Sequence, residues 1–426
     1  MRPVTHQPVS AATTERKRGL IPAWISFDFG NSAFAVIMVT LVMPIYFGNV
    51  IVTDGRGDLY WGIAMSASML IVALMGPVLG AIADSTNSKK NFLIAFSLVT
   101  ILCTAALAFV QPGMVAIAMG LFILANAGFE GGIVFYNAFL PEITDESHYG
   151  RISGYGFAAG YIGSFAILAI LSGHLEANRI SESFLITAAF FLLFALPLFF
   201  VYRRSGIQRG PLQSPIKIGF ARTLDTIRNI RQYKNVGRFL LAFFIYNDAI
   251  LTVIGFSGRY AKNTLGFETA DLIKFFIMIQ LVAAVSSYLF GFLTDKQGPK
   301  RTIVITLFIW CVVCIGSYFA TSSQVFYAVG ALAAIALGSS QSASRAMMAK
   351  LTPADKTTEF FGFYDGFCGK ASAVFGPLIF GVMSDAFGQR EAVLSLIVFF
   401  VAGLYVLMSV KESRVEREEA SLTAVV

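Results

Sequence analysis

The sequence predicts an all-α membrane protein whose twelve transmembrane helices form two pseudo-symmetric six-helix bundles. Three observations lead to this fold class. Hydrophobic residues make up 56% of the 426 residues and charged residues 13%, whereas about a quarter of an average soluble domain is charged. About twelve mostly apolar runs are each long enough to cross a bilayer. A motif of glycine, aspartate and two basic residues occurs at corresponding places in the two halves.

The apolar runs define the expected helices. Each is about 20 residues long, and several are separated by turn-forming stretches such as "TDGRGD" and "QPG". An even number of spans places both termini on the same side of the membrane. We expect spans near 24–50, 60–83, 91–110, 113–139, 152–172 and 184–201 in the first half, and near 238–260, 271–293, 302–321, 325–346, 361–384 and 391–410 in the second.

Lysine and arginine are distributed unevenly between the two membrane faces. About 25 lie on the face that holds the termini, with Arg345 counted among them, and six lie on the opposite face. Cytosolic loops carry the excess of such residues. Both termini are therefore predicted to be cytosolic, and we expect an integral protein of a bacterial inner (cytoplasmic) membrane. Because the basic residues fall in short clusters between apolar runs, we expect no nucleic-acid partner.

A basic stretch separates the two groups of spans. Its apolar residues Ile218, Ala221, Leu224, Ile227 and Ile230 recur every three residues with arginines between them. This pattern predicts an amphipathic helix lying on the membrane surface. The predicted organisation is a cytosolic tail at 1–23, a first bundle at 24–201, a linker at 202–237, a second bundle at 238–410 and a cytosolic tail at 411–426.

The repeated motif follows the second and the eighth span. "GAIADSTNSKK" and "GFLTDKQGPKR" have the same spacing of glycine, acid and basic pair, which indicates a parallel duplication of a six-helix unit. We interpret both copies as a cytosolic gate that braces the helix ends, with ion pairs that form and break as this side closes. The gate residues are Gly80, Asp84, Lys89 and Lys90 in the first copy and Gly291, Asp295, Lys300 and Arg301 in the second.

These two loops resemble those of the major facilitator superfamily. Four segments, at 27–47, 135–143, 245–254 and 344–381, are similar to the branch related to the autophagy-linked vacuolar effluxers. The resemblance implies the twelve-helix major facilitator fold and export of small solutes, with amino acids as the substrate class of the vacuolar members. Two departures matter: Asp365 stands where relatives tend to have a small residue, and "LFILANAGFEGG" lacks the arginine and glycine signature of proton antiporters.

Polar residues within the first bundle are candidates for binding substrate or protons, because an ionisable group inside a span costs about 2.5–3.5 kcal/mol. Asp28 and Asn31 share one stripe of the first span, which either lines a cavity or makes hydrogen bonds between helices. Asn126 and Glu130 share a face of the fourth span, where Gly131 and Gly132 permit close packing. Glu130 is the first candidate for proton binding; the alternative is a hydrogen bond that fixes the packing.

The second bundle supplies five further candidates. Tyr246, Asn247 and Asp248 fall near the bilayer midplane, where substrate sites of such transporters cluster. Asp248 either binds substrate or protons, or forms an ion pair that holds helices together. Asp365 and Lys370 are five residues apart, about 140° around a helix, so they do not pair. Lys370 needs a carboxylate from Asp248 or Glu130, held either statically or exchanged for a substrate.

The predicted function is secondary active transport. The phosphate-binding pattern GxxxxGK[ST] is absent, so we expect no ATP hydrolysis, no enzyme activity, no cofactor and no metal. We expect a monomer, surrounded by membrane lipid, that exports a small amino-acid-like solute by rocker-switch alternating access, and proton coupling is left open. A lipid or lysolipid translocase and a non-transporting sensor or scaffold are the alternatives.

Overall fold

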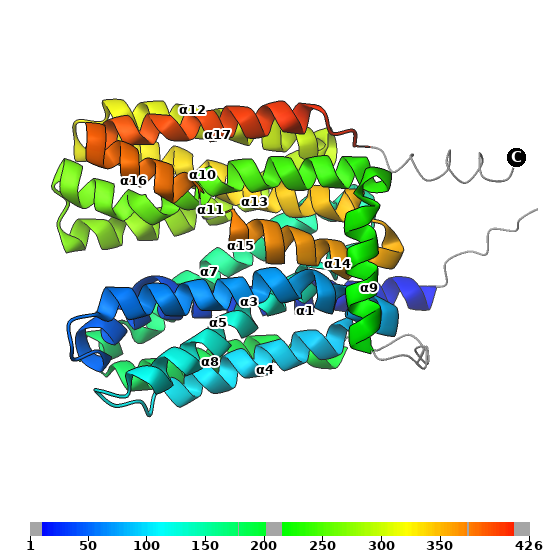
Figure 1. Cartoon of the computed structure of the whole chain (residues 1–426), viewed down its shortest axis with the longest axis horizontal. Helices are drawn as coiled ribbons and strands as arrows, with labels where there is room; N and C mark the ends of the chain where they lie inside the picture. Colours follow the sequence, from blue (N-terminus) through cyan, green and yellow to red (C-terminus); the bar gives the residue numbers. More distant parts are fainter. Residues whose placement is uncertain (1–10, 178, 202–214, 373–374, 413–426) are drawn as a thin grey trace, which may run out of the picture.

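Twelve helical spans run roughly parallel or antiparallel through the molecule in a computed structural model (Figure 1). The structure describes residues 11–177, 179–201, 215–372 and 375–412, and the twelve spans are counted over these residues. Each predicted span overlaps an observed one over most of its length, so the predicted fold class is confirmed. Parts of the predicted tails and residues 202–214 of the linker lie outside the described residues.

The first half contains six spans. The first is a continuous run of α1, η1, α2 and η2, the fourth ends with the short helix α6, and the fifth begins with the short helix η3. The bounds are α1 (Ala11–Phe34), η1 (Ala35–Leu41), α2 (Val42–Tyr46), η2 (Phe47–Ile51), α3 (Gly57–Thr86), α4 (Lys89–Leu107), α5 (Val115–Asn137), α6 (Leu140–Ile143), η3 (Glu146–His148), α7 (Tyr149–Glu176) and α8 (Ile180–Val201).

The second half also contains six spans, and it is reached through the short helices of the linker. The bounds are α9 (Pro215–Arg228) and η4 (Ile230–Tyr233) in the linker, then α10 (Lys234–Leu265), α11 (Thr269–Gln297), α12 (Pro299–Phe319), α13 (Ser323–Leu351), η5 (Ala354–Lys356), α14 (Thr357–Phe361), η6 (Gly362–Cys368), α15 (Gly369–Ala371), α16 (Phe375–Phe387) and α17 (Gln389–Met408).

Within the described residues, two spans contain π-helical turns. In the first, π-helical turns η1 and η2 flank Pro44, whose ring cannot donate the usual backbone hydrogen bond. In the eleventh, the π-helix η6 packs on α3 so closely that a Cβ at Gly362 would lie 2.5 Å from the Gly76 carbonyl oxygen. The eleventh span, expected as one helix, is thus divided where it meets the first half.

The linker helix α9 lies across one end of the bundle, almost perpendicular to the spans (Figure 1). We call this end, where α1 begins and α17 ends, the linker end, and the opposite one the far end. Gly219 packs on α3, and Thr226 is buried. Phe220, Leu224 and Ile227 are about half exposed. The apolar stripe therefore faces outward, as a helix at a membrane surface requires, while small residues face the bundle.

The outer surface of the spans is apolar. A soluble monomer seldom exposes so many large apolar side chains over one continuous surface, whereas a surface in contact with lipid tails requires them. Examples from six different spans are Leu74, Leu102, Leu193, Leu289, Phe319 and Val398, each more than half exposed.

The two halves approach each other at the linker end. Within the described residues, every side-chain hydrogen bond or ion pair recorded between the halves lies between this end and mid-depth. The closest helix pairs are α7 with α11, and α3 with α14 and η6. The structure is therefore closed at the linker end.

Candidate functional site

Arg345 of α13 is the centre of a polar network between the halves. The residue is 1% exposed and its guanidinium extends into the first half. Nε donates to Ser153 Oγ at 2.9 Å, and Nη2 donates to the Ser153 carbonyl at 2.6 Å. Nη1 donates to Asn137 Oδ1 at 2.9 Å and lies 3.5 Å from Asp28 Oδ2. The second half thus places a cation among acceptors of the first.

Aromatic rings and a glycine complete the surroundings of this cation. The guanidinium carbon lies 4.2 Å from the centre of the Phe157 ring and 4.7 Å from that of Trp24, within the range of cation–π attraction. A Cβ at Gly156 would lie 2.8 Å from both Arg345 Nη2 and Asp28 Oδ2. Glycine is therefore needed at 156 for the ion pair to form.

Asp28 and Asp365 lie at the two ends of this network. Asp28 Oδ2 also accepts a hydrogen bond from the Tyr136 hydroxyl at 3.0 Å. Asn137 Nδ2 donates to Asp365 Oδ2 at 2.9 Å, so the amide bridges Arg345 and Asp365. The series Asp28, Arg345, Asn137 and Asp365 passes from one half to the other at each step.

Glu130 and Lys370 form a second contact between the halves, closer to mid-depth. Glu130 is the sixteenth of the 29 residues in its span, which runs from Val115 to Ile143. Lys370 of α15 donates a hydrogen bond to Glu130 Oε2 as an ion pair. Of the two carboxylates that the sequence offered to Lys370, the structure selects Glu130. We call these two contacts, the Arg345 series and the Glu130–Lys370 pair, the central polar network.

The two gate aspartates lie nearer the linker end and contact backbone N–H groups of the opposite half. Asp84 of α3 accepts from Thr358 N at 3.1 Å and from Glu359 N at 2.9 Å, at the start of α14. Asp295 of α11 accepts from Gly150 N at 2.8 Å, at the start of α7. Carboxylates at helix N-termini are stabilised by free N–H groups and by the helix dipole.

We call the contacts of Asp84 and of Asp295 with the opposite half the two aspartate braces. They differ in one contact. Asp295 Oδ2 also accepts from Arg151 Nε at 2.9 Å, which forms an ion pair across the interface. The recorded contacts of Asp84 with the second half are hydrogen bonds to backbone rather than the ion pair that we expected. The gate glycines allow the approach: a Cβ at Gly291 would lie 3.0 Å from the Gly150 carbonyl oxygen, and one at Gly80 would overlap Thr358.

The basic residues of the repeated motif have contacts inside their own halves. Lys89 is buried and donates to the Ala138 carbonyl at 2.9 Å and to Glu142 at 2.6 Å. Lys300 donates to the carbonyls of Met408 and Val410 at 2.8 and 2.7 Å, at the end of α17. Lys90 is half-buried and Arg301 is exposed. Lys89 and Lys300 thus anchor helix ends, while the glycines and aspartates meet the opposite half.

The remaining candidates of the second half lie apart from the central polar network. The Tyr246 hydroxyl is 2.7 Å from Ser344 Oγ, and Asn247 Nδ2 donates to Ser372 Oγ at 2.9 Å. Asp248 Oδ2 accepts from Gly376 N at 2.8 Å, at the start of α16. Asp248 therefore stabilises a helix end within its own half, a role that differs from the predicted ion pair.

Asn31 and Asn126 complete the predicted set. Asn31 is buried in α1, and Asn126 Nδ2 donates to Ser68 Oγ at 2.7 Å within the first half. The structure thus brings Asp28, Glu130, Asp365 and Lys370 to the interface, whereas Asn126 makes its hydrogen bond inside the first half.

The sequence reasoning identified Asp28 but missed Arg345 and its other partners, Asn137 and Ser153. Arg345 was counted on the membrane face, but α13 continues to Leu351 and encloses it. The predicted span ended at 346 because about 20 residues suffice to cross a bilayer, and the basic residue near its end was assigned to the loop. Asn137 and Ser153 also lie near the ends of their helices, and they were overlooked for the same reason.

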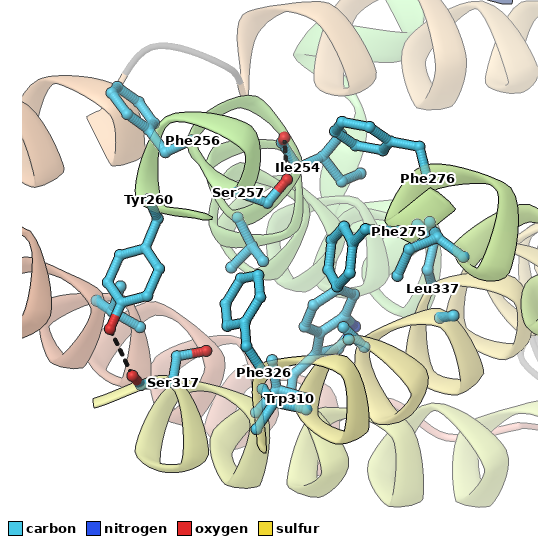
Figure 2. Close-up of a pocket in the computed structure, with 18 of the residues that line it drawn as sticks. Ile254, Phe256, Ser257, Tyr260, Phe275, Phe276, Trp310, Ser317, Phe326 and Leu337 are labelled. Atoms are coloured by element: carbon cyan, nitrogen blue, oxygen red, sulfur yellow. Dashed lines mark hydrogen bonds between the residues drawn. The ribbon is translucent and has the colours of Figure 1, made fainter. Parts of the chain in front are cut away.

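A cavity of about 250 Å³ extends from mid-depth toward the far end (Figure 2). It is lined by α10, α11, α12, α13, α16 and α17, while Thr40 and Tyr161 of the first half complete its wall. None of the predicted binding residues lines it.

Comparisons with known proteins identify the class to which this architecture belongs. The human organic anion transporter MFSD10 (TETRAN) superposes with a TM-score of 0.74 at 14% identity, over 92% of this chain and 99% of that one. FucP, described as a Major Facilitator Superfamily (MFS) transporter, superposes with a TM-score of 0.68 at 17% identity, over 92% of this chain and 99% of that one, so the chain has this fold.

Sequence relatives identify the family. The uncharacterized MFS-type transporter YxiO of Bacillus subtilis is 34% identical over 92% of this chain and 94% of its own length. A multi-drug resistance efflux pump PmrA homolog of Lactococcus lactis is 25% identical over the same shares. Residues 60–420 match the family described as "Vacuole effluxer Atg22 like". The chain belongs to this family and is a membrane transporter.

Proposed function

We propose that this transporter exports a small zwitterionic, amino-acid-like solute by rocking its two halves about the central polar network. One observation carries the proposal: the Glu130–Lys370 pair joins opposite charges from opposite halves near mid-depth. When the halves separate there, each charge loses its partner. Breaking such a pair without replacement costs several kcal/mol.

A zwitterion is the ligand that satisfies both groups at once. Its carboxylate replaces Glu130 at the Lys370 ammonium, and its ammonium replaces Lys370 at the Glu130 carboxylate. Such a ligand binds the separated state and not the paired one, so it shifts the equilibrium between the two. An anion or a cation alone leaves one charge of the pair unmatched.

The direction of transport rests on topology and on relatives. The excess of lysine and arginine at the linker end favours a cytosolic location for this end. The structure, which is closed there, would then represent the outward-facing state. Efflux is supported by the family description and by the efflux pump among the relatives.

Binding to the purified full chain tests the charge requirement. Thermal unfolding is measured with neutral amino acids, with their N-acetyl derivatives, which lack the cation, and with their amides, which lack the anion. We expect one or more zwitterions to raise the melting temperature, because a ligand at 100 times its Kd adds about 2.7 kcal/mol of stability. Stabilisation by the acetylated or amidated form to the same extent contradicts the proposal.

A matched pair of variants ties the effect to this site. Glu130→Gln combined with Lys370→Gln removes both charges and keeps two side chains that can form hydrogen bonds to each other. We expect this double variant to fold and to lose the response to zwitterions. Glu182→Gln, which changes a half-exposed carboxylate paired with Arg179, should respond like the unmodified chain. An unchanged response in the double variant would exclude the central polar network as the binding site.

A further inference from the structure

We infer that the cavity in the second half is a separate binding site for an uncharged, ring-bearing organic molecule with a hydrogen-bonding carbonyl group. The inference concerns binding and holds whether or not this molecule is transported. It rests on the walls of the cavity, on its position and on the polar group that it offers.

The walls of the cavity are apolar and rich in aromatic rings. Figure 2 shows Tyr260, Phe275 and Phe326 on its walls. Phe275 and Phe326 stack with their centroids 5.0 Å apart. The residues that line the cavity, all of them described, include no charged side chain. An ion would lose its hydration without compensation there, whereas a ring gains both apolar burial and aromatic contacts.

The position of the cavity separates it from the central polar network. Its inner end is at Tyr161 and Leu337, near mid-depth, and its outer end is at Tyr260 and Ser317. None of the residues of the central polar network lines the cavity. A small solute held between Glu130 and Lys370 does not fill this space.

Some polar groups on the wall have partners within the protein, whereas Trp310 Nε1 is buried without one in the described part of the chain. The Tyr260 hydroxyl donates to the Ser317 carbonyl at 2.6 Å, and the Ser257 hydroxyl donates to the Ile254 carbonyl at 2.9 Å. The Gln280 side chain also lines the cavity, and no hydrogen bond is recorded for its amide within the described part of the chain. Gln280 can therefore donate to a ligand carbonyl and accept from a ligand hydroxyl or amide.

Three soluble probes test the predicted chemistry on the purified full chain by isothermal titration calorimetry. Coumarin has two fused rings, a carbonyl and no charge. Coumarin-3-carboxylate has the same rings with a negative charge, and heptanamide has an amide without rings. We expect coumarin to bind at least tenfold more tightly than either of the other two. Equal binding of heptanamide would indicate a site for linear chains, and equal binding of the carboxylate would indicate a charged site; either result overturns the inference.

Variants place the binding in this cavity. Gln280→Met keeps the length of the side chain and removes its hydrogen bonds, so we expect a three- to tenfold loss of coumarin affinity, since a net hydrogen bond contributes about 0.5–1.5 kcal/mol. Ala333→Phe adds a ring to the wall and should abolish binding. Gln111→Met, at an exposed position of the first half, is the matched control. Unchanged affinity in both cavity variants, with native melting temperatures, would show that coumarin binds elsewhere.

Discussion

The central polar network and the two aspartate braces hold the same interface closed with different chemistry. In the network, charged side chains of one half meet charged or amide groups of the other, and Arg345 is 1% exposed. In the braces, Asp84 and Asp295 accept mainly from backbone N–H groups near the linker end. Water can replace a backbone donor at an opening surface, but it cannot easily reach a buried guanidinium. The braces can therefore open at small cost, whereas the network needs a replacement partner.

Replacement of Arg345 gives the largest expected effect. Arg345→Leu leaves Asp28 buried beside Tyr136 without its cation, and the loss of one member of a buried pair destabilises a protein by about 3–5 kcal/mol. Thermal unfolding of purified protein measures this loss. Adding Asp28→Asn to Arg345→Leu should recover part of the stability, because the uncompensated charge is then removed. Additive losses in the double variant would show that the two residues do not interact energetically.

Proton coupling provides the second test. It distinguishes a carboxylate of the central polar network, Glu130, from one that stabilises a helix end, Asp248. Glu130 contacts the opposite half, whereas Asp248 accepts from Gly376 N within its own half. If Glu130 carries the proton and also holds the substrate ammonium, Glu130→Gln should abolish uptake driven by a pH gradient in liposomes and weaken solute exchange. Asp248→Asn should retain pH-driven uptake at a reduced protein yield. Persistence of pH-driven uptake in Glu130→Gln would exclude Glu130 as the proton carrier.

The braces should show smaller effects that fall on rate more than on folding. In both Asp84→Asn and Asp295→Asn, the amide oxygen can accept one of the lost hydrogen bonds, so we expect each closed state to lose about 1 kcal/mol. Exchange rates should change several-fold while the melting temperature moves by only a few degrees. Asp295→Asn should have the larger effect because it also weakens the contact with Arg151. A parallel loss of folded protein and transport would indicate a purely structural role.

The same comparison explains how much could be predicted from the sequence. Apolar runs and the repeated motif predicted the twelve spans, because membrane crossing imposes a length and an apolarity on each segment. Glu130 and Lys370 were identified because a charge in the middle of an apolar run is conspicuous. Arg345 was not identified, since it lies one residue before the end of the predicted span and was counted among the basic residues of the membrane face. Its partners became apparent only when the two halves were placed together.

The contact partners of Asp248 and of the linker helix were the hardest to predict from the sequence. Asp248 was expected to bind substrate or protons, or to form an ion pair between helices; its contact with Gly376 N at the start of α16 was not predicted. That contact depends on where the eleventh span is divided, whereas the sequence predicted one span near 361–384. The linker helix was predicted from its apolar period, whereas its docking face of small residues could not be anticipated without α3.

A substitution in the linker helix α9 should give the smallest effect. It tests whether α9, like the braces, helps to hold the linker end closed. It packs on α3 of the first half, and Arg222 Nη2 donates to the Asp355 carbonyl of the second half at 3.2 Å. Arg222→Gln removes this bond at an expected cost of about 0.5 kcal/mol, with the exposed Arg228→Gln as control. If α9 helps to hold the linker end closed, exchange in liposomes should accelerate about twofold in Arg222→Gln and not in Arg228→Gln. Equal rates in both variants would mean that α9 follows the movement of the braces without opposing it.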